Sequence, residues 1–134
     1  MNKENVENNV KKYLEAGYEA AREILTDGEK MDEFLLKLED LLQKVPVAGG
    51  TLAVLPVWAS LLKYYAKGEY GPVPTSTLVV IVCGFFYLLK PGDLIPDFLP
   101  GLGQMDDLFV IAVCEKLAGE EVDRFKAWRD GQEA

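Results

Sequence analysis

Residues 70–89 limit the folds available to this chain more than any other segment, because they contain no charged side chain. Within them, the run LVVIVCGFFYLL at 78–89 would be apolar on every side of a helix. Its β-branched residues at 79–82 do not alternate with polar ones, as a half-buried strand requires. A helix that is apolar all round is either the central helix of a bundle or a helix in lipid.

Two amphipathic helices are predicted before this segment, in residues 1–45. Apolar residues recur at spacings of three and four from Val6 to Leu25, and again from Met31 to Val45. The sequence Thr26-Asp27-Gly28-Glu29 between them resembles a capping box, in which the Thr26 hydroxyl accepts the amide hydrogen three residues on. Both helices need an apolar surface to cover, and the middle of the chain provides one.

Residues 46–134 are predicted to complete one domain, 1–134. A helix is expected over 51–66, which Pro56 either starts late or kinks. After the apolar helix and an Asp/Pro-rich turn, a fifth helix begins at Asp106 or Asp107 and ends at Gly119, and a short last helix follows. We therefore predict an all-α fold: a single compact bundle of about five to six helices around a central apolar helix, with the Asp/Pro-rich turn between helices four and five.

Charge and residue usage exclude several classes of function. The net charge of −8 divides into −5, +3 and −6 over residues 1–40, 41–90 and 91–134, which does not give the dense basic face that nucleic acid requires. The absence of histidine removes Ser-His and Cys-His nucleophiles. Cys83 and Cys114 each lie in an apolar run, which indicates buried thiols in an intracellular chain.

The uncharged segments 45–62 and 70–89 are long enough to raise the question of a membrane hairpin, since a spanning helix needs about 20 mostly apolar residues. Prolines and glycines interrupt both segments and leave roughly a dozen strongly apolar positions, a length more typical of a buried core helix. We expect a cytoplasmic protein, or one peripheral to the inner face of the cell membrane, with integral insertion as the alternative.

Four carboxylates, Asp93, Asp97, Asp106 and Asp107, fall within fifteen residues. Oxygen ligands of this type could hold Mg²⁺ or Ca²⁺, although the ligand spacing of an EF-hand is missing. Each aspartate also has a local use, because Asp93 can cap a short turn and Asp106 or Asp107 can cap the next helix. We expect capping and no cofactor, and retain a divalent metal site as the alternative.

A family resemblance rests on Tyr87, Pro91, Asp93, Leu94, Ile95, Pro96, Asp97, Pro100, Gly103, Asp106 and Asp107. This pattern resembles the signature of the YkvA-like family, domain of unknown function 1232, from about residue 77 to 117. Gly92 departs from it, because the family usually has an aliphatic residue there. The resemblance implies a small helical protein, frequently described as a membrane protein, whose family has no established activity and whose four acidic positions have no assigned role.

Three interpretations of function follow. The first is a non-enzymatic interaction or membrane-associated module, which docks through its apolar middle on a protein partner or a membrane surface. The second is an enzyme that depends on a divalent metal or on carboxylates, centred on the turn at 93–107. The third is a purely intramolecular role for that turn. Nucleic acid is excluded as a partner, whereas a homodimer through the same apolar helices is allowed.

Overall fold

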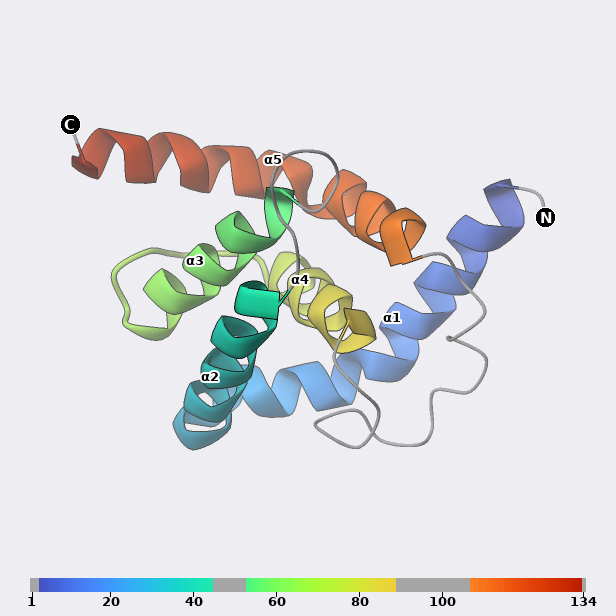
Figure 1. Cartoon of the computed structure of the whole chain (residues 1–134), viewed down its shortest axis with the longest axis horizontal. Helices are drawn as coiled ribbons and strands as arrows, with labels where there is room; N and C mark the ends of the chain where they lie inside the picture. Colours follow the sequence, from blue (N-terminus) through green and yellow to red (C-terminus); the bar gives the residue numbers. More distant parts are fainter. Residues whose placement is uncertain (1–2, 45–52, 89–106, 134) are drawn as a thin grey trace.

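The computed structural model describes residues 3–44, 53–88 and 107–133, which form five α-helices and no strand within those ranges (Figure 1). In chain order the helices are α1 (Lys3–Thr26), α2 (Gly28–Lys44), α3 (Val54–Ala66), α4 (Thr75–Leu88) and α5 (Asp107–Glu133). The prediction of an all-α fold is confirmed.

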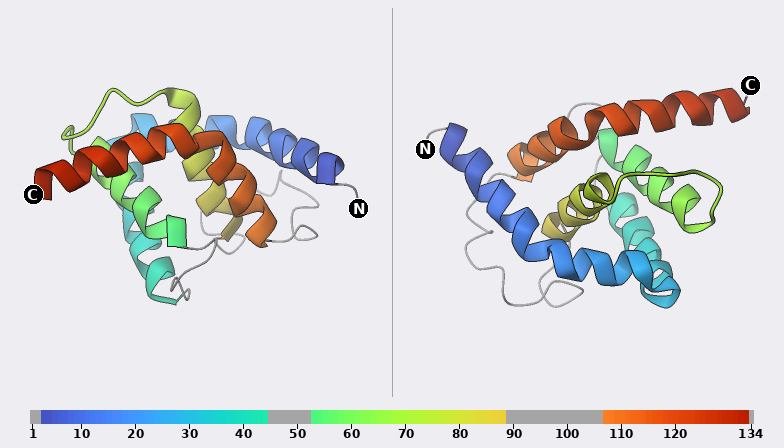
Figure 2. Two further views of the ribbon diagram at one scale, coloured as in Figure 1. Left: turned by 90° about the horizontal axis from the view of Figure 1, so that it is seen from above. Right: turned by 180° about the vertical axis from the view of Figure 1, so that it is seen from behind.

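Helix α4 is the most deeply buried element that the structure describes. Every residue from Ile81 to Phe86 is buried, and Leu78 and Val79 expose no more than 4% of their surface. The helix runs between α1 and α5 and packs mainly against these two (Figures 1 and 2). Full burial of a Val, Leu, Ile or Phe side chain contributes about 1.5–3 kcal/mol, so this one short helix supplies much of the apolar driving force.

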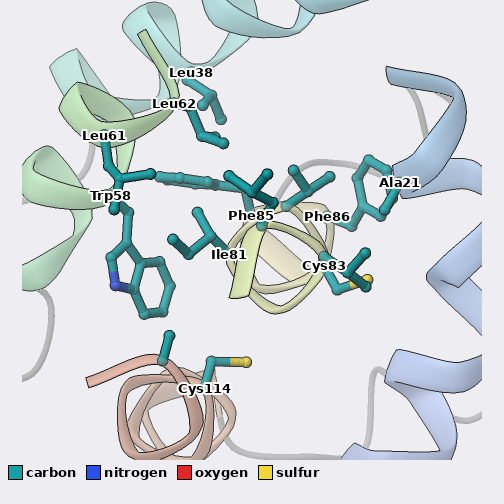
Figure 3. Close-up of a cluster of buried hydrophobic side chains, with 14 of the residues drawn as sticks. Ala21, Leu38, Trp58, Leu61, Leu62, Ile81, Cys83, Phe85, Phe86 and Cys114 are labelled. Atoms are coloured by element: carbon teal, nitrogen blue, oxygen red, sulfur yellow. The ribbon is translucent and has the colours of Figure 1, made fainter. Parts of the chain in front are cut away.

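Helices α2 and α3 reach α4 through aromatic side chains. The ring of Phe34, from α2, meets those of Phe85 and Phe86 edge to face, at centroid distances of 6.3 and 5.7 Å. Trp58, from α3, meets Phe85 in the same way at 5.9 Å (Figure 3). Such pairs add about 0.5–1.5 kcal/mol each beyond their burial, and they fix the faces that α2 and α3 turn inward.

A second aromatic cluster attaches the end of α3 and the following loop to α5. The ring centroid of Tyr70 lies 5.1 Å from that of Phe125 and 4.9 Å from that of Trp128. The ring centroid of Tyr64 lies 5.8 and 5.5 Å from the same two centroids. Arg129 lies 5.5 Å from the ring centroid of Phe125. The C-terminal half of α5 is thereby held against α3.

The junction between α1 and α2 corrects one detail of the sequence prediction. Asp27, rather than Thr26, caps α2: its Oδ1 accepts hydrogen bonds from the amides of Glu29 at 3.0 Å and Lys30 at 3.2 Å. The Thr26 hydroxyl instead donates to the Arg22 carbonyl one turn back, at 2.8 Å. An ionised carboxylate at the N-terminus satisfies the free amides and also interacts favourably with the helix dipole.

Pro56 starts α3 late and does not kink it, which resolves the alternative left open by the sequence. The helix begins at Val54, so Pro56 falls in its first turn, where an amide has no intrahelical acceptor. The helix ends at Ala66, and Gly68 follows with a positive φ of 73°. This is the left-handed conformation that commonly ends a helix and that glycine adopts at low cost.

The prediction that Gly119 ends a helix is wrong, because α5 continues through it to Glu133 as one helix of 27 residues. Its ribbon bends along its length but does not break (Figure 2). Buried residues recur on one face across the glycine, at Cys114, Ala118, Val122 and Phe125. Continued burial of this stripe outweighs the cost of about 1 kcal/mol for a glycine in a helix.

Two glycines provide a matched test of how closely α3 packs on α4. A Cβ at Gly84 would lie 2.9 Å from Cζ3 of the fully buried Trp58, whereas a Cβ at Gly119 would meet nothing within 4 Å. We expect Gly84→Ala to lower the free energy of unfolding by about 1–2 kcal/mol, because overpacking costs more than helix propensity returns. Gly119→Ala should raise it by about 0.5–1 kcal/mol. Urea denaturation measures both, and a stabilised Gly84→Ala protein would contradict the close contact.

Candidate functional site

The acidic turn predicted as a site lies largely outside the described residues. Asp93, Asp97 and Asp106 belong to 89–106, as do Pro91, Leu94, Ile95, Pro96, Pro100 and Gly103. Tyr87 lies in the last turn of α4 and Asp107 is the first residue of α5. Within the residues that the structure describes, no group of three or more His, Cys, Asp or Glu side chains is placed to hold a metal ion. The metal site at the turn stays a prediction.

The two cysteines, on α4 and α5, lie in the core (Figure 3). Cys83 points toward α1, where a Cβ at Gly17 would lie 2.9 Å from its Sγ. Burial raises the pKa of each thiol to about 12, and for Cys83 the nearby Cys114 adds to the effect. Since the thiolate is the reactive form of cysteine, neither residue is a nucleophile at neutral pH.

A groove with a volume of about 610 Å³ lies between α2 and α3. Its lining combines apolar side chains with charged ones at the rims. From α2 come Asp32, Leu35, Leu36, Leu38, Glu39 and Leu42, and from α3 and the residue after it come Pro56, Ala59, Ser60, Lys63, Ala66 and Lys67. On the α3 side, Pro56, Ala59 and Ser60 belong to the uncharged segment 45–62 noted in the sequence. Lys63 and Lys67 follow that segment.

Leu36 is a large apolar side chain of the groove that is open to solvent, at 66% exposure. Helix α2 buries Met31, Phe34 and Leu38 against the core. Because successive residues turn by about 100° around a helix, Leu36 stands about 200° from both Phe34 and Leu38 and cannot join them. It therefore presents an apolar knob beside a concave apolar surface.

The charges of the groove are separated by helix. Asp32 and Glu39 give the α2 side an acidic rim, and Lys63 and Lys67 give the α3 side a basic one. All four are exposed, and none forms an ion pair with another residue in the described ranges. The rims can therefore pair with charges on a bound molecule.

A smaller cavity of about 270 Å³ lies beside α1 and is more polar. Its one charged lining residue is Arg22, whose guanidinium lies 5.8 Å from the centroid of the Tyr18 ring. The other lining residues are Leu25, Thr26, Tyr65, Thr75 and Leu78. With one exposed cation and one apolar wall, this cavity is a weaker candidate for a specific site than the groove.

Sequence reasoning did not single out the groove, although part of its signal was present. The acidic pair at 32 and 39 is seven residues apart and the basic pair at 63 and 67 is four apart, so each pair falls on one helical face. Leu36 is an apolar residue of α2 that lies off its buried stripe. What the sequence could not supply is that these two faces meet at one groove.

Comparison with known proteins shows what the central part of the chain is similar to. Residues 77–113 match the model described as "Protein of unknown function (DUF1232)", which spans most of α4, the connection and the start of α5. The chain is also 30% identical over 69 residues to a Bacillus subtilis (strain 168) protein described as "Uncharacterized membrane protein YkvA", a match that covers 52% of this chain and 65% of that relative. Residues 77–113 therefore resemble the DUF1232 family, as the turn residues indicated, and the chain spans less than two thirds of the length of the relative that it matches. No solved structure matches this chain significantly.

Because this relative is described as a membrane protein, we asked whether a helix of this chain is long and apolar enough to span a bilayer. Among the described residues, none of the helices combines the length and the apolar character needed to cross a bilayer.

Chemical modification tests whether the two thiols are buried and unreactive in the folded protein. We expect Cys83 and Cys114 to remain unmodified by Ellman's reagent in the folded protein at pH 8, about four pH units below their raised pKa of about 12. Both should react fully in 6 M guanidinium chloride, which provides the control. Rapid modification of one thiol in the folded state would show that the core around it is open.

Proposed function

We propose that this protein is a non-enzymatic interaction module whose binding surface is the groove between α2 and α3. The observation that carries the proposal is the combination of a concave apolar surface, the exposed Leu36 and four rim charges that have no ion-pair partner in the part of the chain that the structure describes. A single exposed leucine is ordinary, but an apolar surface rimmed by charges is typical of a protein interaction site. Apolar contacts would supply affinity, and the rim charges would fix orientation.

The lining of the groove favours binding over chemistry. Its one hydroxyl belongs to Ser60, and the chain has no histidine that could activate it. The carboxylates of Asp32 and Glu39 are both exposed to solvent, whereas closed active sites exclude water from the reacting groups. A mixed apolar and charged groove instead resembles the grooves that receive a helix.

A photo-crosslinking amino acid tests this surface in living cells. We expect benzoylphenylalanine in place of Leu36 to give a discrete covalent adduct, because a bound molecule would lie against this side chain. The control carries the same amino acid in place of Ala112, an exposed position of α5. Denaturing electrophoresis and mass spectrometry identify the adduct and show whether it contains this chain or a different protein.

The comparison of the two positions decides the outcome. An adduct at position 36 that is absent at position 112 supports the proposed binding surface. Equal labelling at both positions, or none at either, would contradict it. Circular dichroism on both purified variants verifies that they are folded.

Attachment to a membrane is the second candidate, and the relative described as a membrane protein favours it. We propose that this chain lies in the cytoplasm, peripheral to the inner face of the membrane. Flotation with phosphatidylcholine and phosphatidylglycerol vesicles should then carry the protein upward in low salt, and sodium carbonate should release it. Carbonate-resistant flotation would indicate insertion, and a protein that stays at the bottom would argue against attachment to lipid.

A divalent cation at the turn remains the alternative to a purely binding role. Its ligands would be Asp93, Asp97, Asp106 and Asp107, whose hard carboxylate oxygens suit Mg²⁺ or Ca²⁺. The family match at 77–113 includes all four, so the turn is part of what this chain shares with its family. The lining of the groove comes from α2, α3 and Lys67, so the two candidate sites have no residue in common.

A further inference from the structure

We infer that the groove between α2 and α3 receives a second copy of this chain, in a two-fold symmetric dimer whose axis runs along the groove. The inference rests on the proposed function, because it identifies the occupant of the same surface. Asp32 and Glu39 line one side of the groove and Lys63 and Lys67 line the other. A surface divided in this way is complementary to itself.

The direction of the axis follows from the charges. A two-fold axis parallel to the groove places the acidic rim of one copy opposite the basic rim of the other, and the reverse contact is made by symmetry. An axis across the groove would instead set acidic rim against acidic rim. Like charges placed opposite one another are unfavourable, so the charge distribution selects the first arrangement.

The overall charge of −8 does not prevent this contact. The four rim residues comprise two acids and two bases, so the interacting surfaces are locally neutral. Charges elsewhere on the two copies are screened at distances beyond about 8 Å at physiological ionic strength. The net repulsion between the two copies is strongest in low salt, whereas high salt screens the attraction between the rim pairs, so association should be strongest near physiological ionic strength.

Leu36 supplies the apolar part of the contact. It is 66% exposed in the single chain and stands at the edge of the groove. In the symmetric arrangement, each copy places its Leu36 against the apolar lining of the other, so both side chains become buried. The exposed knob and the concave surface beside it are then two halves of one interface.

Charge reversal tests the inference through analytical ultracentrifugation at physiological ionic strength. The wild-type chain of 14.9 kDa should sediment as a dimer at high protein concentration. Lys63→Glu with Lys67→Glu makes both rims acidic, and Asp32→Lys with Glu39→Lys makes both basic, so each variant alone should be monomeric. An equimolar mixture of the two variants should form a heterodimer, because opposite rims face each other again.

Matched controls change the net charge by the same amount away from the groove. Lys11→Glu with Lys12→Glu and Glu15→Lys with Glu19→Lys lie at exposed positions of α1, and both should dimerise like the wild type. A variant with Leu36→Ser should be monomeric and keep the wild-type melting temperature, which separates loss of association from loss of folding.

Several results would overturn the second copy as occupant: a wild-type chain that stays monomeric up to millimolar concentration, groove variants that dimerise like the controls, or a mixture that stays monomeric. The crosslinking experiment distinguishes this failure from failure of the proposed function. A monomeric chain whose position 36 crosslinks to a different protein overturns the dimer and leaves the groove as a binding surface. A monomeric chain without any specific adduct overturns both.

Discussion

The fold depends on covering α4, because a helix with apolar side chains on every face is stable in water only when other helices shield all of them. Helices α1 and α5 lie along it, and Phe34 and Trp58 reach it from α2 and α3. Leaving one face open would expose several residues, each contributing about 1.5–3 kcal/mol when buried. Total stability is commonly only 5–15 kcal/mol, so the arrangement has little freedom.

This requirement determines which surfaces remain for binding. Helix α2 buries Phe34 and Leu38 in the core, and α3 buries Trp58 and Leu61. The opposite faces of these two helices therefore lie at the surface, next to each other. The groove forms there because one face of each helix is committed to the core while the other carries charges. Leu36 remains outside because no position on the inner face of α2 is open to it. The candidate site is thus a geometric consequence of how the core is covered.

The sequence predicts the elements of this fold better than their junctions. Apolar periodicity identifies α1 and α2, and an uninterrupted apolar run identifies α4, because burial on one face and burial on all faces leave different patterns. The cap of α2 was assigned to Thr26, since Thr and Asp are both good caps and adjacent in sequence, and only the geometry selects Asp27. Gly119 was assigned as an end, although Val122 and Phe125 continue the buried stripe of α5 and could have shown that the helix goes on. The groove was missed because its two faces lie on different helices.

The family match and the groove occupy different parts of the chain. Residues 77–113 build the buried α4, the acidic turn and the start of α5, whereas α2 and α3, which line the groove, precede them. The segment that matches the family model therefore contributes no residue to the lining of the mixed-charge groove. Substitutions at Leu36 or the rim charges leave the matched segment unchanged, so binding at the groove and any role of the acidic turn can be separated experimentally. A loss of association without loss of stability would place the interaction in the covering helices rather than in the part common to the family.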